Sequence, residues 1–155
     1  IYDGRYAVQT QSYGPEARGG ASKSDVIVCD EMIDHPEAED VDLLLAMSQE
    51  ACTKYLPHLK PDGMLVTDAL FVQDTGGRHA YPVHFTEIAR NKIGRAMAAN
   101  VVALGAITAL SPLVSAQAMR AALLATVPKG TEDLNTRAFE EGIKAAREVL
   151  EQRKV

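Results

Sequence analysis

The sequence predicts an α/β fold in which a mostly parallel sheet is followed by a helical C-terminal part. Val41–Met47 is predicted to be a strand, and its continuous apolar run Leu43–Met47 is as expected when both faces of a sheet are covered. A helix over residues 49–59 and a second apolar strand over 64–68 follow it. A strand, a helix and a strand of these lengths form a βαβ unit, whose two strands lie parallel.

The N-terminal elements are predicted from the alternation of apolar and polar residues and from the segments that interrupt it. Residues 5–12 alternate as a strand does, and residues 26–29 form a short apolar strand. Between them, the segment Tyr13–Gly20 holds three glycines and a proline, so it is predicted to be a loop. Residues 34–40 break the pattern again and form an acidic connection.

The remaining elements follow from caps and turn residues. Ser48 is a suitable N-cap for the helix over 49–59, and Pro61-Asp62-Gly63 predicts a turn after it. Residues 71–72 and 79–83 indicate a hairpin or two short strands around a turn at 74–77. The C-terminal part is expected to hold helices over residues 86–92, 95–110, 115–127 and 132–152.

Composition excludes several classes of protein. The 155 residues carry a formal net charge of −5, whereas a domain that binds nucleic acid usually has a basic excess. Residues 96–110 are almost wholly apolar but fall short of the roughly 20 residues that span a bilayer. Two isolated cysteines, Cys29 and Cys52, and no recognisable signal peptide fit the reducing cytoplasm.

The loop over residues 13–20 is the best candidate for a binding site. Its glycines let the backbone approach a ligand and expose its N–H groups. Arg18 and Lys23 supply positive charge suited to phosphate. The residues alone leave open a second interpretation, in which Glu16 and Arg18 only brace a tight loop.

A complete catalytic set is not visible in the sequence. The serines lack a nucleophile-elbow pattern, and the phosphate-binding Gly-x-x-x-x-Gly-Lys-Ser/Thr motif does not occur. The four histidines, with His79 and His84 flanking a strand, lack the spacing of a metal site. Both cysteines are expected to pack rather than react. The sequence therefore favours a binding module over a self-sufficient enzyme.

The predicted helix over 95–110 carries small residues that permit close approach of another backbone. Asn100 is the single amide among them, and a buried Asn without partners would cost about 1–3 kcal/mol. One interpretation is that Asn100 bonds a nearby loop. The other is a core helix with one satisfied amide. The small residues are Ala98, Ala99, Gly105 and Ala106.

The sequence resembles the gamma subunits of 2-oxoacid:ferredoxin oxidoreductases, most closely those of the 2-oxoglutarate type. The Tyr-Gly-Pro-Glu-x-Arg-Gly-Gly pattern of residues 13–20, within the run Gln9–Gly20, is its most specific part. Further matching residues extend over nearly the whole chain: Asp42–Ala46, Ser48–Ala51, Asp62-Gly63, Ala99-Asn100, Leu104–Ala106, Asn135, Ala138-Phe139 and Gly142.

The resemblance implies a three-layer Rossmann-like sandwich and a single gamma-type domain over residues 1–155. Members of the family open with a strand and a Gly-x-Gly-Gly-Gln-Gly loop ahead of the position of Ile1, so we expect the domain to be N-terminally incomplete. The resemblance implies that a set of residues lines a site for coenzyme A, with no catalytic residue and no metal ligand among them. The set consists of Tyr13, Gly14, Glu16, Arg18, Gly19, Gly20 and Asn100.

The resemblance also implies an activity and partners. The enzyme would oxidatively decarboxylate 2-oxoglutarate to succinyl-CoA and pass electrons to ferredoxin. Alpha, beta and ferredoxin-like delta subunits would hold thiamine diphosphate, Mg and iron–sulfur clusters, while this chain handles coenzyme A and docking. The sequence leaves three alternatives open. The chain could form a homodimer, it could belong to a pyruvate- or indolepyruvate-type enzyme, or it could be a purely structural subunit without a ligand.

Overall fold

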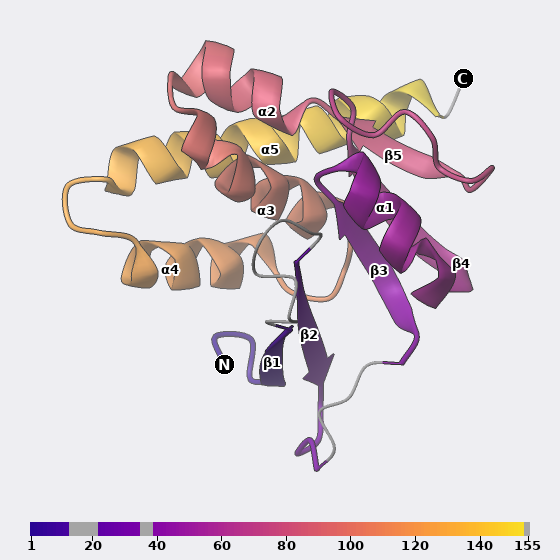
Figure 1. Cartoon of the computed structure of the whole chain (residues 1–155). Helices are drawn as coiled ribbons and strands as arrows, with labels where there is room; N and C mark the ends of the chain where they lie inside the picture. Colours follow the sequence, from indigo (N-terminus) through magenta and orange to yellow (C-terminus); the bar gives the residue numbers. More distant parts are fainter. Residues whose placement is uncertain (13–21, 35–38, 154–155) are drawn as a thin grey trace. The chain divides into compact units, whose positions relative to one another are not determined.

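The computed structural model describes residues 1–12, 22–34 and 39–153 (Figure 1). The chain divides into two compact units. The first consists mainly of residues 3–67 and 71–81, and the second of residues 68–70 and Pro82–Val155. Strands gather in the first unit and helices in the second, which confirms the α/β class and the helical C-terminal part.

The first unit begins with an antiparallel hairpin. β1 (Tyr6–Ser12) pairs with β2 (Lys23–Cys29), from Tyr6 opposite Cys29 to Ser12 opposite Lys23. Both strands agree with the sequence prediction, and β2 begins three residues earlier than expected. Alternate residues share a face, because side chains alternate along a strand. Val8 and Ile27 are half-buried on one face, whereas Gln9 and Val26 are exposed on the other.

The predicted βαβ unit is present and its strands are parallel. β3 (Val41–Ala46) leads through the N-cap Ser48 into α1 (Gln49–Tyr55), a short 3-10 turn η1 (Leu56–His58) and β4 (Leu59–Asp68). The sheet order is β3-β4-β5, with β5 at Ala80–Val83. Its core cluster is apolar and consists of Ala46, Cys52, Leu59, Leu65 and Val72.

Three details of this unit differ from the prediction. The helix ends at Tyr55, because Pro57 falls in the 3-10 turn and Leu59 already joins the sheet. The expected turn at residues 61–63 lies inside β4, where the register jumps from Val41–Leu59 to Leu43–Met64. Residues 71–72 form no strand, and Val72 packs in the core cluster.

The second unit holds the helices. The segment expected to be helical over 86–92 is a short α2 (Phe85–Ile88) that continues into a π-helix, η2 (Ala89–Ile93). Gly94 ends it at φ 80°, a conformation that glycine adopts without strain. After a 3-10 turn, η3 (Ala96–Ala98), come α3 (Ala99–Leu110), α4 (Ala116–Thr126) and α5 (Glu132–Gln152).

The helices α3 and α5 run side by side with their backbones in contact (Figure 1). A Cβ at Gly105 would overlap the carbonyl oxygen of Phe139, and one at Gly142 would overlap that of Val102. This contact confirms the prediction that the small residues of the 95–110 segment admit another backbone. Among the described residues, no helix combines the length and apolar character needed to cross a bilayer.

Candidate functional site

The predicted binding loop connects the paired ends of the β1–β2 hairpin. Its six candidate residues lie outside the described residues: Tyr13, Gly14, Glu16, Arg18, Gly19 and Gly20. The structure does describe the base of the loop, where Ser12 is the register partner of Lys23. The chain therefore leaves one strand and re-enters its neighbour at the same end of the hairpin.

Polar side chains occupy the loop end of this hairpin. Gln9 donates from Nε2 to the hydroxyl of Ser24 at 2.9 Å on the exposed face. On the opposite face, Lys23 Nζ lies 2.6 Å from a carboxylate oxygen of Asp25. The cation of Lys23, expected to attract phosphate, is thus already paired, so a phosphate would have to compete with Asp25.

Asn100, the seventh candidate, lies in the first turn of α3 and is exposed rather than buried. Its Oδ1 accepts a hydrogen bond from the adjacent backbone N–H of Val101 at 2.8 Å. The expectation of a buried amide was therefore wrong. The reason is positional, because the buried face of α3 is lined by apolar residues that include Val101, Val102 and Ala106.

An amide clamp lies beside the carboxyl end of β3. Gln49, the first residue of α1, accepts from the backbone N–H groups of Gln73 and Asp74 at 2.9 Å each. The same amide donates from Nε2 to the carbonyl oxygen of Asp74 at 2.8 Å. These bonds fix the loop that follows β4. Sequence reasoning missed this role, and the only signal was a Gln directly after the N-cap Ser48.

A buried carboxylate, Asp68, ends β4 and was also missed. It is fully buried, and its Oδ2 accepts from the backbone N–H of Thr86 at 3.2 Å and from the Thr86 hydroxyl at 2.6 Å. Its Oδ1 accepts from the backbone N–H of Leu70 at 3.0 Å. These bonds satisfy the carboxylate and tie the end of the strand to the first turn of α2.

The two thiols differ in their surroundings. Cys52 is buried in the core of the first unit, and burial, followed by the negative charge of Asp74, raises the pKa of its thiol. A thiol held in this protonated form is a poor nucleophile. Cys29 is half-buried in β2, and its Sγ lies 2.6 Å from the carbonyl oxygen of Glu31. Cys52 therefore packs, as expected.

No metal centre emerges from the part of the chain that the structure describes. Groups of three or more His, Cys, Asp or Glu side chains that could hold an ion do not occur there. His84 contacts Glu87 on the same helical turn, and His58 Nδ1 lies 3.3 Å from the carbonyl oxygen of Glu39. His79 and His84 flank β5, as predicted.

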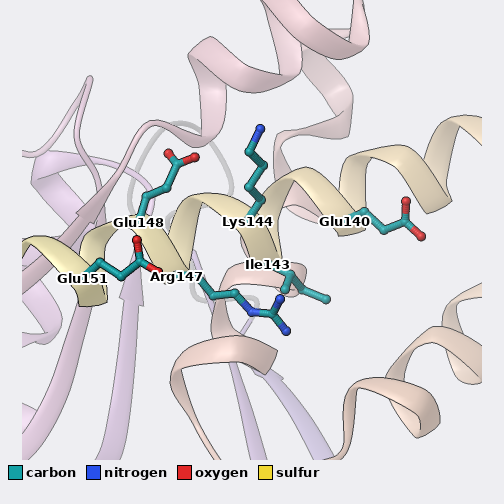
Figure 2. A pocket seen from close by; sticks show the side chains of 6 residues that line it. All are labelled: Glu140, Ile143, Lys144, Arg147, Glu148 and Glu151. Atoms are coloured by element: carbon teal, nitrogen blue, oxygen red, sulfur yellow. The ribbon is translucent and has the colours of Figure 1, made fainter.

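Two open hollows lie on the described surface. One, of about 320 Å³, is formed in the first unit by Thr53, Leu56, Pro57, Asp74, Gly76 and Arg78. The other, of about 380 Å³, follows α5 and is lined by Glu140, Ile143, Lys144, Arg147, Glu148 and Glu151. Figure 2 shows these α5 side chains splaying to either side of the helix, so this hollow is a solvated helix surface.

These features define a class of protein, an α/β protein with a parallel βαβ unit and a helical C-terminal part. The family model for pyruvate ferredoxin/flavodoxin oxidoreductase matches residues 1–145, so the chain belongs to this family of oxidoreductases. This family assignment confirms the resemblance found in the sequence.

The chain is similar to subunits of 2-oxoglutarate synthases and of a ketoisovalerate oxidoreductase. It is 44% identical to the 2-oxoglutarate synthase subunit KorC of Methanocaldococcus jannaschii, over 96% of this chain and 82% of that protein. It is 42% identical to the KorC subunit of Methanothermobacter marburgensis, over 92% and 81% of the two chains. A ketoisovalerate oxidoreductase subunit, VorA, of Methanothermobacter thermautotrophicus is 34% identical over 96% of this chain and 32% of its own.

Solved structures share the fold. The gamma subunit of a keto/oxoacid ferredoxin oxidoreductase from Geobacter sulfurreducens matches with a TM-score of 0.87 and 43% identity, over 96% of this chain and 82% of that one. The 2-oxoglutarate:ferredoxin oxidoreductase of Magnetococcus marinus, solved with 2-oxoglutarate, coenzyme A and succinyl-CoA, matches with a TM-score of 0.79. At 23% identity, over 94% of this chain and 26% of that one, it supports the fold alone.

Proposed function

We propose that this chain is the gamma-type subunit of a 2-oxoglutarate:ferredoxin oxidoreductase, and that residues 1–155 act as one gamma-type domain. The observation that carries the proposal is the 44% identity to a 2-oxoglutarate synthase subunit over 96% of this chain and 82% of that protein. The enzyme would join the succinyl group of 2-oxoglutarate to coenzyme A, release CO₂ and pass the electrons to ferredoxin.

The division of labour within the complex is part of the proposal. Alpha, beta and ferredoxin-like delta subunits would hold thiamine diphosphate, Mg and the iron–sulfur clusters. The chain's two cysteines, one of them buried, suit a subunit that ligates no cluster itself. We place the complex in the cytoplasm, where ferredoxin accepts its electrons.

The loop over residues 13–20 would contribute to coenzyme A binding. Three glycines and Arg18 in one hairpin connection suit a phosphorylated ligand, because exposed N–H groups and a guanidinium both bind phosphate oxygens. The paired residues Ser12 and Lys23 hold the ends of this connection next to each other. Asn100 would contribute only if the ligand reaches the exposed start of α3.

Substitution of Arg18 tests the binding role. Arg18→Ala in the assembled enzyme should raise the Michaelis constant for coenzyme A about tenfold, as expected for the loss of one charge-assisted hydrogen bond. Arg147→Ala, which removes an exposed arginine of α5, should leave that constant unchanged. An unaltered constant in Arg18→Ala removes Arg18 from the site.

A second candidate function is a structural subunit without a ligand. The pairing of Lys23 with Asp25 favours it, since this ion pair leaves less free positive charge at the base of the loop. Calorimetric titration of coenzyme A into the complex separates the binding role from the structural role. If this chain is only a structural subunit, Arg18→Ala should not weaken the binding of coenzyme A.

The first experiment is a co-purification from the native host with a tag on this chain. Recovery of a thiamine-binding subunit and an iron–sulfur subunit, with ferredoxin reduction that depends on 2-oxoglutarate, supports the proposal. Faster turnover of pyruvate, indolepyruvate or ketoisovalerate by the same complex would reassign the substrate. A chain that is recovered alone, or only as a homodimer, would overturn it.

A further inference from the structure

Two segments of the chain line the open hollow of the first unit. One is the loop over residues 73–78, which follows β4, and the other is the end of α1 with the turn η1. The hollow measures about 320 Å³, within the range of about 300–1,000 Å³ in which proteins bind small molecules. Its lining residues, all in the first unit, are Thr53, Leu56, Pro57, Asp74, Gly76 and Arg78.

The loop segment of this lining is held at three points. The amide clamp of Gln49 fixes its start. Thr75 and Arg78 close the turn, because the Thr75 hydroxyl donates to the carbonyl oxygen of Arg78 at 2.8 Å and the Arg78 N–H donates back at 3.0 Å. Arg78 Nη2 also donates to the carbonyl oxygens of Lys60 at 2.5 Å and Pro61 at 3.2 Å. A ligand would therefore meet a preorganised loop, which loses little conformational freedom on binding.

Asp74 and Arg78 bring opposite charges to the hollow without neutralising each other. Asp74 Oδ1 accepts the backbone N–H of Gly76 at 2.8 Å, and its Oδ2 has no hydrogen-bond partner among the residues that the structure describes. Arg78 donates only from Nη2 there, so its Nε and Nη1 are available. Neither side chain forms an ion pair within the described part of the chain.

These two charges select among ligands. A phosphate would be attracted by Arg78 but repelled by Asp74, and a metal ion would meet the reverse, since like charges brought together oppose binding. A molecule that carries both an ammonium and a carboxylate satisfies both side chains. Hydrogen bonds between ionised groups are also stronger than those between neutral groups.

Leu56 and Pro57 add apolar surface beside the charges. Leu56 is half-buried and Pro57 is exposed. Gly76 lies against Leu56, since a Cβ at Gly76 would approach Leu56 Cδ2 to 3.0 Å. An apolar group of the ligand would cover this surface, and its removal from water would favour binding.

We propose that the hollow binds a small α-amino acid with an apolar side chain. The ammonium of the ligand would lie at Asp74, its carboxylate at Arg78, and its side chain over Leu56 and Pro57. This site goes beyond the proposed function and does not depend on it, because all its residues belong to this chain.

Titration of leucine into the ¹⁵N-labelled full chain, followed by NMR, tests the site. The amide resonances of Thr53, Gly76 and Gly77 should shift and saturate in the millimolar range. Two analogues serve as controls, because 4-methylpentanoate lacks the ammonium of leucine and 3-methylbutylamine lacks its carboxylate. Each should bind at least about tenfold more weakly than leucine, since each loses one charge-assisted hydrogen bond. The proposal fails if leucine gives no saturating shift, or if either analogue binds as tightly as leucine.

A substitution of Asp74 tests the ammonium contact. Asp74→Asn keeps the oxygen that accepts from Gly76 but removes the charge, so it should weaken leucine about tenfold. It should leave the weak binding of 4-methylpentanoate unreduced, because that analogue has no ammonium. Asp62→Asn makes the same change at an exposed position outside the hollow and should bind leucine as the wild type does. Equal affinity of leucine for Asp74→Asn and Asp62→Asn contradicts the proposal.

The test is independent of the place of this chain in an enzyme. If leucine does not bind but the co-purified complex reduces ferredoxin with 2-oxoglutarate, the amino-acid site falls and the proposed function stands. If the chain is recovered alone but binds leucine through Asp74, the site stands without the proposed function.

Discussion

Gly105 of α3 and Gly142 of α5 are reciprocal contact points between the two helices. Each glycine lies against the carbonyl oxygen of a residue three positions from the other glycine, Phe139 and Val102 respectively. Because backbone meets backbone there, neither helix has room for a methyl group. The helix pair therefore has one defined register and separation.

Gly142→Ala should destabilise the fold by up to about 2 kcal/mol, because overpacking costs about 1–3 kcal/mol and alanine regains only roughly 1 kcal/mol of helix propensity. Urea denaturation of the full chain measures the change. Ala121→Gly at an exposed position of α4 is the control and should cost only about 1 kcal/mol. A Gly142→Ala midpoint at or above that of the wild type would contradict the observed contact.

Asp68→Asn should cost about 2–4 kcal/mol of unfolding free energy, since it leaves buried donors of Thr86 without an acceptor. The amide retains one oxygen, so it can replace only part of the carboxylate's three hydrogen bonds. Asp62→Asn, at an exposed position, is the control and should be neutral. If the two variants unfold at the same denaturant concentration, Asp68 does not hold the strand to α2.

Gln49→Ala should release the loop that follows β4. The backbone amides of Gln73 and Asp74 lose their acceptor, and we expect their hydrogen exchange to accelerate about tenfold. Gln117→Ala on the exposed side of α4 should leave exchange at Gln73 and Asp74 unchanged. Gln49→Glu keeps the acceptor but not the donor, so it should protect both amides better than Gln49→Ala. Equal exchange in all variants would disprove the clamp.

The two thiols should react at different rates. Cys29 is half-buried and should react with a disulfide reagent first, whereas buried Cys52 should react only as the chain opens. Cys29→Ser should therefore remove the fast phase, and Cys52→Ser the slow one. A slow phase that persists in Cys52→Ser would contradict this assignment.

The raised pKa of Cys52 also gives stability a pH dependence of known sign. The unfolded chain releases this proton first, near the ordinary value of 9.0, so the contribution of Cys52 is complete below pH 9 and declines above it. Cys52→Ala should reduce this alkaline decline in denaturation midpoint. An identical decline in both proteins would assign it to other groups.

Local chemistry made much of the fold predictable. Ser48 caps α1 as expected, Ser115 caps α4, and α5 begins at Glu132 and ends at Gln152, its predicted limits. These boundaries depend on neighbours within a few residues, which the sequence contains. The parallel pairing of β3 with β4 was also predictable, because a βαβ connection of this length permits little else.

Less of the candidate site could be predicted from local sequence patterns. The glycine loop could be found because its pattern is continuous along the chain. Both interpretations of Asn100 assumed a buried amide although it is exposed, since its apolar neighbours obscured which face of α3 is buried. The clamps made by Gln49 and Asp68 join residues 18 to 25 positions apart, which no local pattern reveals.

By itself, the sequence determined the α/β class, the βαβ unit, the limits of the long helices and the family, because periodicity, caps and motifs are properties of contiguous residues. Only the tertiary structure decided that Gly105 and Gly142 each lie against the backbone of the other helix, that Asp68 accepts from Thr86 in the first turn of α2, and that Lys92 pairs with Glu141. The physical reason is that contact and burial depend on which distant segments pack together, and packing is settled by the folded chain as a whole.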